Sequence, residues 1–456
     1  MKHTKKFLSL ICVIALLFTL VACGKGGNKG GGGKGEDAVV DLGGYTIHVV
    51  AAWELEPSAD SAKEQNRLRY NRWKEVEQKF NCTIVFDVVT DLYDQLEASA
   101  MSGEPLGDVL NVRGEKVHSM ASQGLLFPIG DVVDLEKKQY IRDNEDLFTV
   151  GDKVYAFSIM RPQVESTIFF NKGIFKRFGL ETPYQMMEKG TWTMENFAKL
   201  AKSATRDTNG DGKIDIYGMA AITIDPEITY FINAFGGSTV KKDKDGKFVS
   251  GLKDAKTLDA LNFLRKMNLN DKSTLMPTGK PTWDWGFTQF NNGKVAMCQS
   301  NITSGIVTGA KENLADGYGI VPMPLGPGQK EYKQTSQSQL CYVMQSSLDK
   351  ELAKKIGKVM DAYWAPVVDE EREDALREDE FEQYSSDEES VANLMMLDKL
   401  PNPTFPQYGF GNAWWDSVNN QFYHALVGNT TVATAMDTCN PVFQADLDVA
   451  NDRLAP

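Results

Sequence analysis

The sequence lacks the residue patterns that mark most catalytic and metal centres. It has only six cysteines and four histidines in 456 residues, and no two cysteines have the C-x-x-C spacing of a zinc cluster. The H-E-x-x-H, G-x-S-x-G and phosphate-loop patterns are missing as well. Glycoside hydrolysis needs only two carboxylates, but nothing in the sequence singles out a pair. We therefore expect that the protein is not an enzyme, and we assign no catalytic residue.

An excess of basic charge is also lacking. The chain carries 49 Lys and Arg against 62 Asp and Glu, which gives a formal net charge of −13. Nucleic-acid binding requires a basic surface, and so does a body that lies flat on anionic lipid. The composition therefore argues against both kinds of partner.

Long hydrophobic runs are limited to one, at the start of the chain. Three lysines among the first six residues precede the apolar run Phe7–Leu20, which is too short for a transmembrane helix. Basic, apolar and then small residues are typical of a cleaved export signal. Residues 20–23, Leu-Val-Ala-Cys, resemble the lipobox of bacterial lipoproteins. The resemblance implies a signal peptide over residues 1–22 and lipidation of Cys23. The alternative is an ordinary secretory leader with an incidental cysteine.

Glycine dominates the segment that follows the leader. Residues 23–36 have almost no apolar surface to bury, so we expect a flexible tether. Together with the lipid, it would hold the folded body at the extracytoplasmic face of the cell membrane. Four cysteines remain beyond the tether, and the sequence leaves free thiols and two disulfides equally open: Cys82, Cys298, Cys341 and Cys439.

The rest of the chain has roughly 420 residues, more than one ordinary core supports, which favours two lobes. Strand-like runs at residues 45–51, 83–89 and 108–112 alternate with helical patterns at 65–80, 91–101 and 116–122. This alternation predicts an α/β lobe with a mainly parallel sheet. Ligands of such lobes meet the loops at the carboxyl ends of the strands. Here those loops contain residues 52–54 and 113–115.

A series of short motifs resembles one protein family in the family's own order. It includes Asp-Val-Leu-Asn-Val at 108–112, Lys-Val-Tyr-Ala-Phe at 153–157, Thr-Trp-Thr-Met-Glu-Asn-Phe at 191–197, Phe-Asn-Asn-Gly-Lys-Val-Ala-Met at 290–297 and Tyr-Gly-Ile-Val-Pro-Met-Pro at 318–324. The chain resembles family 1 extracellular solute-binding proteins, the sugar receptors of ABC importers.

The resemblance implies a two-lobe, type II periplasmic-binding-protein-like α/β fold with discontinuous lobes and a hinge. The N-terminal lobe would contain residues 37–164 plus 338–398, and the C-terminal lobe 167–335 plus 403–456. The chain would cross between the lobes near Val164–Ile168, Ser336–Tyr342 and Leu397–Pro403. Residues 369–389 are strongly acidic. We interpret them as a solvated surface segment, with a basic partner as the alternative.

Residues 207–215 have the oxygen spacing of a calcium loop. Side-chain oxygens recur at loop positions one, three, five and nine, Gly212 occupies position six, and a backbone carbonyl falls at position seven. Position twelve is Gly218, so the usual glutamate is missing. The resemblance implies a structural Ca²⁺ ion bound by Asp207, Asn209, Asp211, Lys213 and Asp215. The alternative is a metal-free turn built from Asx residues and glycine.

Aromatic and polar residues near predicted loops provide a candidate sugar site, because sugars present apolar C–H faces to aromatic rings and hydroxyls to polar groups. Taken singly, a Trp belongs to a core more often than to a site, and we interpret Trp285 as a core residue. Strand ends and the resemblance together imply these ligand-binding residues: Trp53, Glu54, Arg113, Glu115, Lys116, Tyr230, Trp283, Trp414 and Trp415.

The combined expectation is a monomeric, lipid-anchored receptor. It would bind a carbohydrate, expected to be an oligosaccharide, between its lobes and deliver it to the membrane subunits of an ABC permease. Three alternatives stay open: the same scaffold with a peptide or another polar solute, a surface glycoside hydrolase, and a scaffold that binds nothing.

Overall fold

The computed structural model describes residues 40–137, 139–302 and 306–452. The expected signal peptide, Cys23 and the tether lie outside the described residues, so lipidation stays a prediction. Among the described residues, no helix has the length and hydrophobicity needed to cross a membrane.

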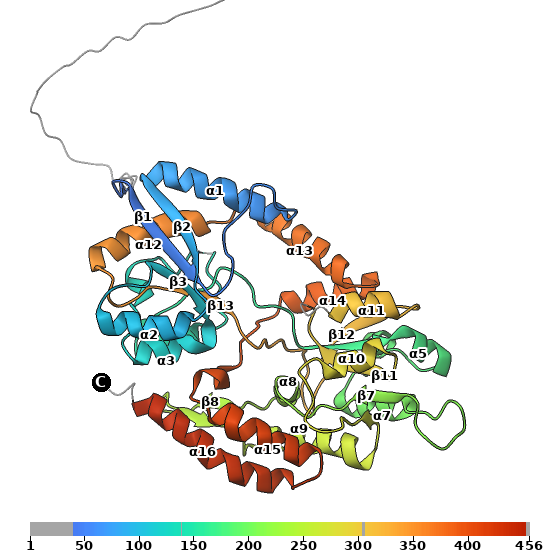
Figure 1. Ribbon diagram of the computed structural model, residues 1–456. Helices are drawn as coiled ribbons and strands as arrows, with labels where there is room; N and C mark the ends of the chain where they lie inside the picture. Colours follow the sequence, from blue (N-terminus) through green and yellow to red (C-terminus); the bar gives the residue numbers. More distant parts are fainter. Residues whose placement is uncertain (1–39, 138, 303–305, 453–456) are drawn as a thin grey trace, which may run out of the picture. The chain divides into compact units, whose positions relative to one another are not determined.

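The first sheet has four strands in the order β13-β3-β1-β2 (Figure 1). Strands β1 (Tyr45–Ala51), β2 (Cys82–Val88) and β3 (Val109–Arg113) are parallel, and β13 (Leu340–Val343) pairs antiparallel with β3. Ile47 and Val50 of β1 pack into hydrophobic clusters on opposite faces of the sheet. Because both faces are covered, apolar and β-branched residues run along the strand. The three predicted strands and the mainly parallel pairing are confirmed.

Helices α1 (Glu64–Phe80) and α12 (Lys350–Trp364) cover one face of this sheet, and α2 (Leu92–Ser102) and α3 (Val117–Ser122) cover the other. Trp364 of α12 packs edge-on against Phe157, which joins the late helix to the early core. The shorter elements nearby are η1 (Gly114–Lys116), η2 (Ile129–Asp131), α4 (Glu145–Phe148), β4 (Thr149–Val150) and β5 (Lys153–Val154).

The second sheet has five strands in the order β10-β7-β11-β6-β12. They are β6 (Thr167–Asn171), β7 (Tyr217–Ala220), β10 (Thr274–Leu275), β11 (Val295–Ser300) and β12 (Tyr318–Pro322). Strands β10, β7 and β11 are parallel, and β6 is antiparallel to both of its neighbours. Phe169 and Phe170 of β6 are fully buried in different hydrophobic clusters. Two layers of helices therefore enclose this sheet as well.

The remaining elements belong mostly to these two layers. They are α5 (Lys172–Phe178), α6 (Pro183–Glu188), α7 (Met194–Ala204), α8 (Glu227–Ala234), β8 (Val240–Lys242), β9 (Phe248–Ser250), α9 (Ala255–Arg265), η3 (Lys266–Asn270), α10 (Trp285–Asn291), α11 (Ile306–Asn313), α13 (Glu370–Tyr384), α14 (Glu388–Asp398), η4 (Pro406–Gly409), η5 (Trp414–Val418), α15 (Asn419–Leu426) and α16 (Val432–Asp452).

Three segments of the chain are hydrogen-bonded side by side where the two sheets are joined. The Asn402 side chain donates to the carbonyl of Gln163 at 2.9 Å. Ser336 forms an isolated parallel bridge with Thr404. The Ser166 hydroxyl lies 2.9 Å from the carbonyl of Thr335, to which it donates. The first two segments lie at the crossings expected near Val164–Ile168 and Ser336–Tyr342. The third passes the same junction, but it is not a crossing, because α12 packs on the first sheet and the chain after it, from α13 onward, packs on the second.

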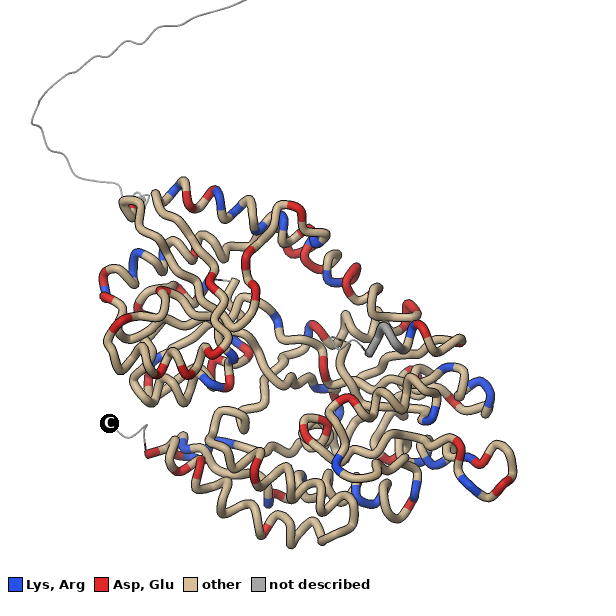
Figure 2. The backbone as a smooth tube through the Cα atoms, in the orientation of Figure 1, with Lys and Arg blue, Asp and Glu red and all other residues tan. Residues whose placement is uncertain are grey.

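Helices α13 and α14 correct the expected content of the N-terminal lobe. Residues up to 398 were assigned to that lobe, but α14 packs on strand β12 of the second sheet. Phe381 of α13 is fully buried in the same cluster as Leu394 of α14. The acidic residues of α13 (Figure 2) do face solvent on most turns. The sequence argument missed the buried anchor because a single phenylalanine is inconspicuous among so many charges.

The four cysteines of the described residues are buried free thiols: Cys82, Cys298, Cys341 and Cys439. Burial raises the pKa of Cys82 to about 11 and that of Cys439 to about 12. The reactive thiolate is therefore scarce at neutral pH. The structure resolves the open question in favour of thiols that serve as small apolar core residues.

We predict that Phe381→Ala lowers the free energy of unfolding by about 3–5 kcal/mol, because it removes a fully buried ring from the second core. Urea unfolding followed by circular dichroism measures the change. Glu378→Ala, an exposed position on the same helix, is the matched control and should change stability by less than about 0.5 kcal/mol. Equal effects of the two substitutions would show that α13 is not anchored through Phe381.

Candidate functional site

A small cavity opens at the carboxyl ends of the parallel strands β7 and β11 in the second sheet. Its walls come from Ala220 and the four residues that follow it, the start of α8, residues 281–282, the first turn of α10, and Cys298 and Gln299 of β11. The cavity has a volume of about 20 Å³, which is room for one water-sized polar group. Open α/β sheets bind ligands at this end of their strands.

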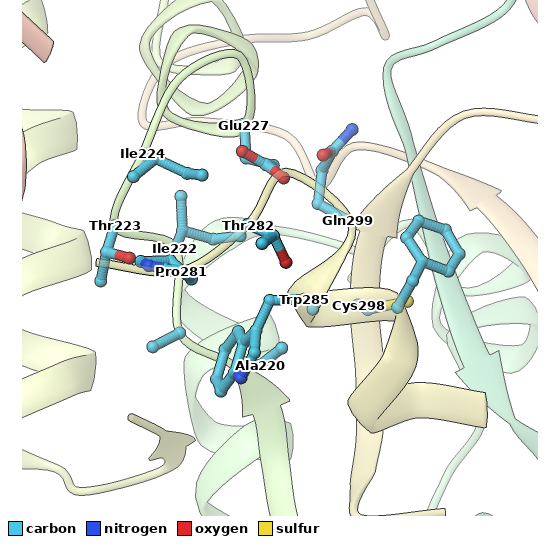
Figure 3. Close-up of a pocket in the computed structure, with 13 residues that line it drawn as sticks. Ala220, Ile222, Thr223, Ile224, Glu227, Pro281, Thr282, Trp285, Cys298 and Gln299 are labelled. Carbon is cyan, nitrogen blue, oxygen red and sulfur yellow. The ribbon is translucent and has the colours of Figure 1, made fainter. Parts of the chain in front are cut away.

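The cavity contains polar atoms without protein partners. The Oε2 atom of Glu227 and the hydroxyl of Thr223 are buried and have no hydrogen-bond partner among the described residues. Figure 3 shows Thr282 between the Glu227 carboxyl on one side and the Trp285 indole on the other. Burial raises the pKa of Glu227 to about 8. At neutral pH its carboxyl is largely protonated and can both donate and accept a hydrogen bond.

Two further buried acids lie next to this wall, and both have donors. Asp225 accepts hydrogen bonds from the Tyr408 hydroxyl and from the Trp414 indole, the latter at 3.3 Å. Glu165 accepts from the Tyr230 hydroxyl at 2.7 Å. Burial raises the pKa of both carboxyls. Neutral donors surround these acids, which leaves Glu227 as the member of the group without a partner on Oε2.

The predicted residues of the first lobe lie at the ends of β1 and β3. Trp53 donates its indole N–H to Asn111 Oδ1 at 3.1 Å, and Glu54 Oε1 accepts from the backbone of Glu56. Glu115 is only 3% exposed and accepts from the Ser338 hydroxyl at 2.6 Å. Burial raises the pKa of its carboxyl. Its neighbours Arg113 and Lys116 are exposed.

The backbone of Gly409 closely approaches Glu115. A Cβ atom at residue 409 would lie 2.0 Å from the carbonyl oxygen of Glu115, so only glycine fits there. This contact brings η1 of the first sheet's lobe to η4, which is adjacent in sequence to the predicted Trp pair.

The predicted aromatic residues divide into buried and exposed members. Trp414 is fully buried, with edge-on contacts to Phe422 and Phe443, and Tyr230 is 3% exposed. Neither offers a free ring face in this structure. Trp415 is 42% exposed and stacks on Tyr408, with 4.9 Å between the ring centroids, and Trp283 is 67% exposed. Trp415 and Trp283 therefore stay the better candidates for stacking on a sugar.

Sequence reasoning missed the residues that line the cavity. Glu227 and Gln299 were not proposed. Trp285, interpreted as a core residue, does pack against the cluster that contains Phe169, but it also lines the cavity. A signal was present: Asp225-Pro226-Glu227 follows strand β7 after four intervening residues. Acids at the carboxyl end of a buried strand are candidates for a site rather than for a solvated surface.

The loop at residues 207–215 forms a compact turn held by its own carboxylates. Asp207 accepts from the backbone of Gly210 and Gly212, and Asp215 accepts from the backbone of Thr208. These bonds hold the pKa of both carboxyls below the usual range. The charged oxygen donors suit calcium, although the described residues form no group of three or more acidic, His or Cys side chains that could hold a metal ion. Calcium binding stays a prediction.

Comparison with known proteins gives a consistent family and fold. The family model described as bacterial extracellular solute-binding protein matches residues 68–360. A cyclic α-maltosyl-1,6-maltose binding protein from Arthrobacter globiformis is similar in structure, with a TM-score of 0.63 at 13% identity; the match covers 89% of this chain and 100% of that chain.

Two further structures have the same fold. For the galacto-N-biose/lacto-N-biose I-binding protein of an ABC transporter from Bifidobacterium longum, the TM-score is 0.59 at 15% identity, with 91% of this chain and 98% of that chain covered. For a maltose/maltodextrin-binding domain from Bdellovibrio bacteriovorus, the TM-score is 0.54 at 16% identity, and the match covers 89% of this chain and 100% of that chain. No curated protein matches the chain.

We predict that removal of calcium by EDTA lowers the melting temperature and that millimolar CaCl₂ restores it, because the oxygen-rich loop would lose its counter-ion. Differential scanning calorimetry measures both changes. Asp211→Asn should abolish the calcium response, whereas Asp243→Asn, in the exposed β8–β9 turn, should keep it. A melting temperature that does not respond to calcium would identify the loop as a metal-free turn.

Proposed function

The chain belongs to the bacterial extracellular solute-binding protein family, and on this premise we propose that it binds an oligosaccharide and delivers it to an ABC permease. The family and the two-lobe, type II periplasmic-binding-protein-like fold are those of transport solute-binding proteins rather than enzymes. The expected resemblance and fold class are thereby confirmed. The proposal adds the identity of the ligand, which neither the family nor the fold determines.

The composition of the cavity is the observation that carries the proposal. The Trp285 indole supplies an apolar face, and the Glu227 carboxyl and Gln299 amide supply hydrogen-bonding groups. The cavity holds one substituent of a sugar rather than the ring. A ring at its mouth would need this combination, because its C–H face packs on an aromatic ring while its hydroxyls need polar partners. The structural relatives described above are named for sugar ligands, which supports a saccharide over a peptide.

Two exposed indoles favour a ligand longer than one ring. Trp283 follows the cavity residue Thr282 directly. Lys280, in the same loop, donates to Asn420 of α15 at 2.9 Å, and α15 continues from η5, which contains Trp415. The two exposed rings therefore lie on segments that contact each other. A saccharide of several rings has enough length to meet them in addition to the cavity.

The anchor and the permease complete the proposed role. A lipid on Cys23 and the glycine-rich tether would keep the receptor, as a monomer, at the extracytoplasmic face near its importer. Flexible chains of this composition restrict distance without fixing orientation. Such freedom suits a receptor that must turn toward both its ligand and its permease.

We predict that maltose-type or other neutral oligosaccharides raise the melting temperature and change the tryptophan fluorescence, whereas peptide libraries do neither. Trp415→Ala should weaken sugar affinity by about 10-fold, since one aromatic contact contributes roughly 1–2 kcal/mol. Isothermal titration calorimetry measures the affinity. Met101→Ala, at an exposed apolar position on α2, should leave it unchanged. Binding of peptides alone would reassign the ligand class, and steady release of smaller sugars would reassign the protein to hydrolases.

We predict that Cys23→Ala shifts the protein from the membrane fraction to the culture medium or the soluble fraction, because the lipid attachment site is lost. Cell fractionation and immunoblotting measure the distribution. Cys12→Ala, inside the expected signal peptide, is the control and should remain membrane-bound. Unchanged retention of the Cys23 variant would refute the lipid anchor.

A further inference from the structure

Three buried acids, Glu165, Asp225 and Glu227, interact with Tyr230 and form no ion pair among the described residues. Burial raises the pKa of the Tyr230 phenol, and the charges of these three acids raise it further. Glu165 and Asp225 have neutral donors, as described above, and none of these donors carries positive charge. Buried acids are ordinarily paired with a cation or protonated. The protein itself thus supplies hydrogen bonds to this group of acids but no compensating charge.

Glu227 is the one of the three acids that a positively charged group of a ligand can contact. Its Oε2 atom lies in the cavity wall and has no hydrogen-bond partner among the described residues. No lysine, arginine or histidine lines the cavity. The other titratable groups that interact with Glu227 are Asp225, Tyr230, Tyr408 and Cys298, all of which are neutral or acidic.

The other groups of the cavity suit a small cation. Its volume of about 20 Å³ accommodates an ammonium group but no larger charged group such as a guanidinium. The Thr223 hydroxyl, 1% exposed and without a partner, is a second free acceptor in the same wall. The Trp285 indole adds an aromatic surface, which attracts cations.

On the premise that the protein binds a carbohydrate, we propose that this cavity is a subsite for a protonated amine, so that the ligand is an amino sugar. The ammonium donates to Glu227 Oε2. Glu227, held largely protonated by burial in the free protein, gives up its proton to solvent when the ammonium binds. A neutral hydroxyl at the same place would form only one ordinary hydrogen bond with the protonated carboxyl.

The test compares sugars that differ only by an amine in place of a hydroxyl. Glucosamine, galactosamine and β-1,4-linked glucosamine oligomers are titrated into the full-length protein in detergent at about pH 7, where an amine with a pKa near 8 is mostly charged. Glucose, galactose and β-1,4-linked glucose oligomers are the matched neutral ligands. We expect the amine-bearing member of a pair to bind about 10-fold or more tightly, as is typical of a charge-assisted hydrogen bond.

Glu227→Gln removes the charge and keeps the shape of the side chain. It should abolish the preference for the amine while neutral sugars still bind, whereas Glu331→Gln, an exposed acid, should keep the preference. An equal or weaker affinity for the amine, or a preference that survives E227Q, overturns the subsite but not carbohydrate binding. Failure of every sugar in the panel overturns both proposals. The ratio measured on the unmodified protein decides the question even when E227Q does not fold.

Discussion

The hydrogen bonding of one buried carboxyl, Glu165, is the constraint on which the junction between the sheets depends. Its side chain accepts from the Tyr230 hydroxyl of α8 and from the backbone of Gln337, and its own carbonyl accepts from the Gln299 amide of β11 at 3.0 Å. One residue at the first crossing is thereby bonded to the second crossing and to two elements of the cavity wall. An acid buried this deeply is tolerated only when donors surround it, so the positions of these four segments are specified together.

The sequence allowed the first sheet and the first two crossings to be predicted because their signals are local or ordered along the chain. Residues 45–51, 83–89 and 108–112 alternate with amphipathic helices, and that pattern alone predicts parallel strands. The prediction of which residues belong to the N-terminal lobe was wrong for α13 and α14. The charge pattern shows that a helix is exposed, but it does not show which core the apolar face of that helix packs against. Phe381 determines that choice because it is buried in the same hydrophobic cluster as Leu394, which only the folded chain shows.

The site was harder to predict than the fold. Aromatic residues near loops identified Trp415 and Trp283, which are exposed, but equally Trp414 and Tyr230, which are buried. Composition cannot separate the two kinds, because the indole that anchors a loop and the indole that contacts a ligand stand next to each other in sequence. Glu227 escaped notice for the opposite reason. In a chain with 62 acidic residues, a single unpaired carboxyl becomes visible only through its burial and its missing partner.

Tyr408 physically connects the exposed aromatic surface to the buried acids. Its ring stacks on Trp415, 15° from parallel, while its hydroxyl donates to Asp225, which also accepts from Trp414. The buried tryptophan of the pair therefore has a part in the site without touching a ligand, because it fixes the Asp225 carboxyl that orients Tyr408. A ligand stacked on Trp415 would press on a ring that is already bonded to an acid two residues from Glu227. The aromatic contact and the polar cavity are thus held in one hydrogen-bonded framework, and substitutions in either part should affect the other more than independent sites would.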